Sequence, residues 1–247
     1  MIEFINNLNS DDTKKFGKKA CHLAKLCQND IRIPKGFVIS TDINEKNFLY
    51  FQDEILDFFE RLNSNYVSVR SSMTMEDCKE HSFAGLFDSY IKVTRNRLFK
   101  NIINCWKSIK SERVKTYCNF KRIDYDSLRM AVIVQYMIEA EKSSIVFTQN
   151  PVNKKNEIVI EAFKGPCKFI VSGKIGPCRY YINKSDFHLE TIESKKEIST
   201  LDESDINEIK KISLYIENIF NFPQDIELVK ERNGKWWVLQ SRPITCL

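Results

Sequence analysis

Apolar residues recur at helical spacing in four parts of the chain. The longest part is 202–220, which has acidic residues in its first turn and these apolar residues on one face: Ile206, Ile209, Ile212, Ile216 and Ile219. Residues 51–62 and 97–120 show the same period, and residues 17–27 predict a helix that opens at Gly17. We therefore expect four helices.

Short apolar runs predict strands between these helices. The run MAVIVQY at 130–136 is typical of a buried strand, and shorter runs predict strands at 37–39, 66–69, 145–147, 158–162 and 169–171. Because the strands and helices do not alternate regularly, the pattern favours an α+β fold over a doubly wound parallel sheet.

A β-hairpin is predicted near the C-terminus, in the stretch DIELVKERNGKWWVLQSRPIT at 225–245. Asn233-Gly234 is the strongest short-range signal for a two-residue type I′ turn. That turn pairs Arg232 with Lys235 and Glu231 with Trp236, and further along it pairs Val229 with Val238, Glu227 with Gln240, and Asp225 with Arg242. The opposite, apolar face would then carry Ile226, Leu228, Trp237 and Leu239.

The polar face of this hairpin has two interpretations. The Glu227 carboxylate beside the Gln240 amide oxygen is a pair of hard oxygen ligands that suits Mg²⁺, and Arg242 next to them suits a phosphate. The alternative is a solvated outer face with an Arg242–Asp225 cross-strand pair, since charge pairs are common on protein surfaces. The hairpin alone leaves both interpretations open.

The composition limits the classes of function. The 247 residues are 43% hydrophobic and 29% charged, with a formal net charge of +5 that no long block of Lys and Arg concentrates. We therefore do not expect a nucleic-acid-binding protein, whereas a small anionic ligand is compatible with this balance. No apolar run approaches the ~20 residues of a membrane span, and the N-terminus lacks the basic start and apolar stretch of a signal peptide. The expectation is a cytoplasmic protein that does not contact membranes.

The sequence lacks several well-known site patterns. Eight cysteines and three histidines occur without a CxxC pair, so the spacing of zinc ligands is absent. Without a secretory signal, the cysteines are expected to be free thiols in a reducing compartment. The phosphate-binding pattern GxxxxGK[ST] and the dinucleotide pattern GxGxxG are absent too.

Five segments, in order along the chain, resemble one family. They are FGKKACHLAKL followed by IPKGFVIS, VSVRSSMTMEDCKEHSFAGLFDSYIKV, MAVIVQYMIEAEKSSIVFTQNP, IEAFKGPCKFIVSGKIGP, and PQDIELVKERNGKWWVLQSRPIT. Together they are similar to the ATP-binding domain, of ATP-grasp type, of pyruvate phosphate dikinase, phosphoenolpyruvate synthase and rifampin phosphotransferase. The resemblance covers Phe16 to Thr245 and implies a two-lobed α+β domain, with lobes at about 1–130 and 131–247.

The resemblance implies ATP and Mg²⁺ as ligands and a role for each matched position. Lys19, Arg70 and Arg242 would act on the phosphates as catalytic residues, and Glu227 and Gln240 would bind Mg²⁺. The nucleotide-binding positions would be Lys19, Arg70, Ser82, Ala84, Gly85, Ser89, Gln135, Met137, Ile138, Glu227, Gln240 and Arg242. Positive charge around a triphosphate fits phosphoryl transfer, which needs positioning and charge neutralisation more than covalent help.

These positions also have purely structural interpretations. A lysine at a helix start, such as Lys19, is usually solvated, and Arg70 could form an ion pair with Glu76 or Asp77. The Ser82-Phe83-Ala84-Gly85 segment, which would cover the phosphates, could be an ordinary turn. The segment 135–138, which would receive adenine, could be a plain core strand.

The resemblance also implies a partner. In the family, a histidine on a separate, mobile domain receives the β-phosphate of ATP, leaving AMP and phosphate, and passes it on to pyruvate or another small molecule. No carrier motif surrounds His22, His81 or His188. We therefore expect the acceptor histidine on a separate protein or on another part of a longer chain.

Some residues depart from the family pattern and support a second hypothesis. Gly165-Pro166-Cys167-Lys168 stands where the family has Gly-Leu-Gly-Glu, Cys178 stands where it has Asp, and Lys18 replaces a glycine. These changes favour a non-catalytic ATP-binding or regulatory module, or a degenerate structural remnant. The retention of Glu227, Gln240 and Arg242 favours a phosphotransferase.

Overall fold

The computed structural model describes residues 1–75, 83, 85–165, 177–186, 188–193 and 200–244. The chain divides into two compact units. Unit 1 comprises Met1–Gln28 and Pro34–Met137, and unit 2 comprises Asn29–Ile33 and Ile138–Leu247. The sequence led us to expect a division near residue 130, whereas the structure divides the chain after Met137.

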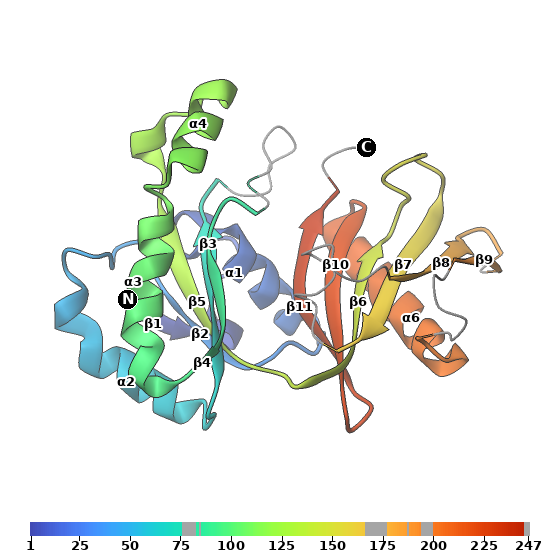
Figure 1. The fold of residues 1–247 in the computed structure, drawn as a ribbon, viewed down its shortest axis with the longest axis horizontal. Helices are drawn as coiled ribbons and strands as arrows, with labels where there is room; N and C mark the ends of the chain where they lie inside the picture. Colours follow the sequence, from blue (N-terminus) through green and yellow to red (C-terminus); the bar gives the residue numbers. More distant parts are fainter. Residues whose placement is uncertain (76–82, 84, 166–176, 187, 194–199, 245–247) are drawn as a thin grey trace. The chain divides into compact units, whose positions relative to one another are not determined.

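Unit 1 is built around a five-stranded antiparallel sheet with the strand order β1-β2-β5-β3-β4 (Figure 1). Its strands are β1 (Ile2–Phe4), β2 (Gly36–Ile39), β3 (Val67–Met73), β4 (Ser89–Val93) and β5 (Met130–Tyr136). The strands predicted at 37–39, 66–69 and 130–136 are confirmed. The sequence did not predict β1, which has three residues, or β4, which is mostly exposed and mixes polar with apolar residues.

The sheet of unit 1 is accompanied by helices. Within the described residues they are α1 (Thr13–Gln28), α2 (Gln52–Arg61), α3 (Leu98–Ser108) and α4 (Glu112–Lys121). A single core joins the sheet to α2 and α3 through residues such as Val69, Val132 and Ile102, while α1 also contacts β3 and β5. The single helix predicted at 97–120 is wrong, because the chain turns at 109–111 and Ser111 takes the extended conformation of an N-cap before α4.

In its described residues, unit 2 contains a six-stranded antiparallel sheet with the order β11-β10-β6-β7-β8-β9 and the long helix α6 (Glu203–Phe220) (Figure 1). The strands are β6 (Ala140–Phe147), β7 (Glu157–Lys164), β8 (Cys178–Asn183), β9 (Leu189–Glu193), β10 (Gln224–Glu231) and β11 (Trp236–Pro243). The runs predicted at 145–147 and 158–162 lie within β6 and β7. The predicted strand at 169–171 lies outside the described residues, and β8 and β9 were not predicted.

The predicted helix at 202–220 is confirmed as α6. Asp202 is its N-cap, and its side chain accepts a hydrogen bond from Asp205 N at 2.8 Å. The Asp205 side chain accepts from Asp202 N in return, which completes a capping box. Two of the four unpaired amides at the start of the helix are thereby satisfied.

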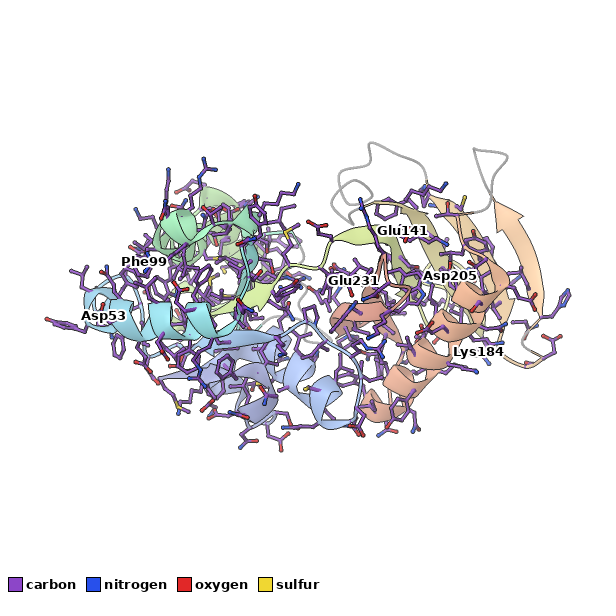
Figure 2. All side chains as sticks on the ribbon, turned by 90° about the horizontal axis from the view of Figure 1, so that it is seen from below. Asp53, Phe99, Glu141, Lys184, Asp205 and Glu231 are labelled. Carbon is purple, nitrogen blue, oxygen red and sulfur yellow. The ribbon has the colours of Figure 1, made fainter. Side chains whose placement is uncertain are left out.

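Asp205, which is labelled on α6 in Figure 2, also fastens that helix to the sheet. The residue is 1% exposed, and its carboxylate accepts hydrogen bonds from Lys142 Nζ at 2.6 Å, Lys230 Nζ at 2.5 Å and Trp236 Nε1 at 3.1 Å. Burial alone would raise the pKa of Asp205, but Lys142 and Lys230 together outweigh it and hold the pKa below the usual 3.8. The helix therefore covers the sheet face that carries these three side chains, and the opposite face is not covered by α6.

The structure also bears on membrane-spanning helices and on disulfides. Within the ranges that it describes, no helix combines the length and the apolar character that crossing a bilayer requires. No disulfide joins the cysteines of those ranges, which are Cys21, Cys27, Cys105, Cys118 and Cys178.

Candidate functional site

Strands β10 and β11 form the predicted hairpin, with a different turn. Glu231 N donates to Lys235 O at 2.9 Å and Gly234 N donates to Glu231 O at 2.9 Å, so the three residues 232–234 make the loop. Gly234 has a φ of 87°, the left-handed conformation that closes loops of this length. The predicted two-residue type I′ turn is therefore wrong.

A β-bulge restores the predicted register beyond this turn. The longer loop places Val238 opposite Leu228, one residue out of step with the prediction. The register then shifts between Leu228 and Glu227, which leaves Leu239 as the extra residue of β11. Past the bulge, Glu227 pairs with Gln240 as predicted.

Between the longer turn and the bulge, the side chains of β11 that face α6 are not the predicted ones. Trp236 and Val238 are buried, whereas Trp237 and Leu239, which the sequence assigned to the apolar face, are only half-buried. The prediction for these two residues is wrong because it assumed unbroken alternation along β11. Trp236 is the residue whose indole reaches Asp205.

Four polar side chains lie together on the sheet face opposite α6. Glu227 pairs with Gln240, and Asp225 pairs with Arg242 one step along the same face. Arg242 donates from Nε and Nη2 to Asp225 Oδ2 at 2.9 and 2.7 Å. Burial raises the pKa of Asp225, the Arg242 charge opposes that shift, and Glu227 adds to it. The ion pair thus holds the Arg242 guanidinium beside the Glu227–Gln240 pair.

The chemistry of this group fits Mg²⁺ bound together with phosphate. A carboxylate and an amide oxygen stand opposite each other on adjacent strands, and protein sites for Mg²⁺ often supply only one or two such ligands, leaving the rest to phosphates and water. Across the described part of the chain, no group of three or more His, Cys, Asp or Glu residues could hold a metal ion. A metal at Glu227 and Gln240 would therefore complete its oxygen ligands with a bound phosphate and water.

Unit 1 brings the FGKK and VRSS segments together. Lys19 is 8% exposed, and its Nζ donates to Ser71 O at 3.1 Å. Ser72 Oγ donates to Phe16 O at 2.9 Å and accepts from Ala20 N at 3.0 Å. These bonds join the start of α1 to the end of β3, although 52 to 56 residues separate the partners in sequence.

Gly17 makes this junction possible. α1 is interrupted there by a non-helical conformation with a φ of 73°. A Cβ at Gly17 would lie 2.2 Å from Ser72 O, which is closer than any real side chain could approach. The prediction that a helix opens at Gly17 is confirmed in part, since helical structure begins at Thr13 and restarts after Gly17.

Arg70 lies on the same side of β3 as Ser72, because alternate residues of a strand share a face. It pairs with Ser89 of β4 on one side and with Ile133 of β5 on the other. Gly85 is exposed, has a φ of 72°, and has open space where a Cβ would be. Ser82 and Ala84 lie outside the described residues, as do Glu76 and Asp77.

The segment expected to receive adenine lies where unit 1 passes into unit 2. The Gln135 side chain is buried, and its Nε2 donates to Pro34 O at 3.0 Å, so it serves the packing of unit 1. Met137 Sδ accepts from Lys92 N at 3.2 Å, and Met137 N donates to Tyr66 O at 3.4 Å. Ile138 is the first residue of the main segment of unit 2 and is buried.

Sequence reasoning missed the role of Ser72. Its hydroxyl caps the restarted part of α1 from a distant strand, and a capping residue that is remote in sequence leaves no local pattern. Sequence reasoning also assigned no role to Glu161 and Arg179, whose side chains form an ion pair at 2.7 Å on the same sheet face as Glu227. The sequence offered only the polar character of these two residues, because the strand that carries Arg179 was itself not predicted.

Comparison with known proteins identifies relatives of this chain. A family described as the AMP/ATP-binding domain of pyruvate phosphate dikinase matches residues 49–199 and 187–247. A probable phosphoenolpyruvate synthase of Pyrococcus horikoshii is 30% identical across the whole chain, and the phosphoenolpyruvate synthase of Pyrococcus furiosus is 33% identical across 91% of it. The matches cover 33% and 32% of these proteins, so the chain spans about a third of the length of its curated relatives.

Solved structures with low sequence identity were also found. A D-alanine-D-alanine ligase from Coxiella burnetii has a TM-score of 0.49 and 12% identity, with 96% of this chain and 50% of that one covered. The ATP-grasp ligase PsnB has a TM-score of 0.45 and 13% identity, with 98% and 56% covered. In this chain, the two antiparallel sheets with their helices confirm the predicted α+β class.

Proposed function

The chain belongs to the pyruvate phosphate dikinase AMP/ATP-binding domain family, and from this membership we propose that it is the ATP-binding part of a phosphotransferase. In the proposed reaction, a histidine of a separate protein takes the β-phosphoryl group of ATP and water takes the γ-phosphoryl group, leaving AMP and phosphate. The observation that carries the proposal is the alignment of Glu227, Gln240 and Arg242 on one face of the hairpin.

Each unit contributes residues of suitable chemistry. In unit 2, Glu227 and Gln240 would hold Mg²⁺, which neutralises phosphate charge when bound, and Arg242 would donate to a phosphate oxygen. Its ion pair with Asp225 restricts the guanidinium and so reduces the ordering needed when ATP binds. In unit 1, Lys19 and Arg70 would add positive charge at the junction of α1 and β3.

The first test is ATP binding. At about 100 times its Kd, a ligand that binds only the folded protein adds roughly 2.7 kcal/mol to the free energy of unfolding. We expect ATP with Mg²⁺ to raise the melting temperature measurably, and ATP with EDTA to raise it less. A melting temperature that ATP does not change under either condition would argue against every ATP-binding function.

The second test is AMP formation by a Glu227→Ala variant. Removing the carboxylate should lower AMP formation with a histidine acceptor by about 100-fold or more, because charge stabilisation at the phosphates is lost. Glu231→Ala is the matched control, since Glu231 lies on the same strand near the turn and bonds to Asn233 and Trp237. Full turnover by the Glu227 variant would contradict the site. ATP binding by the wild type without AMP formation from any acceptor would instead support a regulatory module.

A further inference from the structure

Unit 2 has a cavity of about 500 Å³ on the sheet face opposite α6. Its floor is formed by Phe147, Val159 and Tyr181 from β6, β7 and β8. The Glu161–Arg179 ion pair borders it on one side, and the loop 150–155 borders it on the other. The volume lies within the roughly 300–1,000 Å³ typical of ligand sites.

The sheet register places this cavity directly beside the Glu227 group. One row of paired residues runs Gln240, Glu227, Ile145, Glu161 and Arg179, and the next runs Arg242, Asp225, Phe147, Val159 and Tyr181. Paired residues share a face and adjacent strands lie about 4.8 Å apart. The cavity therefore continues the same two rows that carry the proposed phosphate site.

The direction of β6 shows on which side of the phosphate site the cavity lies. The strand begins at Ala140, two residues after Ile138, where the resemblance places the adenine. It reaches Ile145, the partner of Glu227, about 17 Å later, and Phe147 about 7 Å beyond that. The cavity thus lies past the phosphate group, at the end of β6 that is remote from the base.

The loop over the cavity is ordered by its own hydrogen bonds. Asn150 Oδ1 accepts from Val152 N at 2.9 Å and from Asn153 N at 3.3 Å, and Asn150 Nδ2 donates to Glu157 Oε1 at 2.6 Å. This arrangement presents Val152 at the rim with 89% of its surface exposed. Because Val152 takes part in these bonds through its backbone N–H, a substitution of its side chain changes the rim of the cavity without removing the bonds that order the loop.

We propose that this cavity receives the polypeptide segment that carries the acceptor histidine. The inference rests on the proposed function and adds the docking site for its partner. The cavity is lined by aromatic rings, amides and charges of both signs, a mixture that suits a peptide loop better than a lone anion. Its position past the phosphate site suits the histidine that accepts the phosphoryl group. Val152 and Pro151 would contact the apolar part of the segment.

Binding of a fragment that carries the unphosphorylated acceptor histidine tests the docking site. The probe is the part of the Pyrococcus furiosus phosphoenolpyruvate synthase that remains when the region matching this chain is removed. Its Kd is measured for the wild type, for Val152→Asp and for Tyr215→Ser. Tyr215 is a matched control because it is 47% exposed on α6, at the opposite face of the same sheet. We expect Val152→Asp to weaken binding at least about tenfold and Tyr215→Ser to leave it unchanged.

AMP formation with free imidazole as the phosphoryl acceptor distinguishes a loss of docking from a loss of chemistry. It offers the same nucleophile without a segment to dock, so Val152→Asp should form AMP from imidazole at the wild-type rate and bind ATP as the wild type does. If wild type and Val152→Asp bind the fragment equally well, or if neither binds it, the docking site is overturned. A weakened ATP shift in Val152→Asp also overturns it, because the cavity would then belong to the nucleotide. Fragment binding through Val152 without any AMP formation would refute the proposed function and leave the docking site standing.

Discussion

At the scale of single residues, the part of the candidate site in unit 1 depends on a close approach of two backbones. Gly17 lets α1 pass within van der Waals distance of β3, and Ser72 joins the two by bonding to Phe16 O and Ala20 N. The absence of a side chain at Gly17 is therefore a condition for the position of Lys19. A glycine that was identified in the sequence only as a helix start has a packing role as well.

Replacing Gly17 with alanine should be costly. The new Cβ would overlap Ser72 O and the backbone would remain at a positive φ, so we expect a loss of about 3 kcal/mol or more. Gly234→Ala is the matched control, because Gly234 also has a positive φ but has nothing within 4 Å of the added Cβ. It should lose about 1–2 kcal/mol. Urea unfolding measures both, and equal losses would contradict the role of the close approach.

At the scale of elements, the hairpin shows why part of the site was predictable. The pairs Glu227–Gln240 and Asp225–Arg242 were predicted correctly, yet two deviations of one residue each had cancelled: a longer turn and the bulge at Leu239. The assignment of Trp237 to the buried face failed because it lies between those deviations. Periodicity predicts a register where alternation is unbroken, and the sequence contains no strong signal for a bulge.

The contact between α6 and the sheet depends on Asp205, and Asp205→Asn tests it. The substitution removes the partner of two largely buried lysines, so we expect a loss of about 3 kcal/mol at neutral pH. Since the folded pKa of Asp205 lies below 3.8, its contribution is present above that pH and is lost as the pH falls through the folded value. The difference between wild type and variant in urea unfolding should therefore shrink below about pH 4.

Glu60→Gln is a suitable control for that experiment. It removes a carboxylate from the ion pair with Arg95, in which both side chains are more than half exposed. Exposed pairs contribute little, so this variant should unfold at nearly the wild-type urea concentration. A loss in Asp205→Asn no larger than that of Glu60→Gln would show that the buried cluster does not fasten the helix.

At the scale of the whole molecule, the two units are not contiguous in sequence. Residues 29–33 belong to unit 2, although they lie between two segments of unit 1. Arg32 O accepts from Val238 N at 2.9 Å, and the Arg32 guanidinium lies 5.8 Å from the Trp237 ring centre. This segment therefore covers part of the edge strand β11. No local pattern predicts such an exchange, because its partners are about 200 residues apart.

A fragment of residues 138–247 tests the role of this segment. Without 29–33, β11 would present amides and carbonyls that can pair with another chain. We expect the fragment to associate in proportion to its concentration in sedimentation experiments. The same fragment with 29–33 joined to its N-terminus by a flexible linker should remain monomeric. Monomeric behaviour of both fragments would show that the edge needs no cover.

Because residues 29–33 belong to unit 2, they must be considered when chimeras with relatives are built. A crossover after Met137 separates the main segments of the two units, but it would combine β11 of one parent with the covering segment of another. Functional hybrids should therefore inherit 29–33 and β11 from the same parent, so the unit of exchange is defined by this hydrogen-bonded pairing and not by the order of residues along the chain.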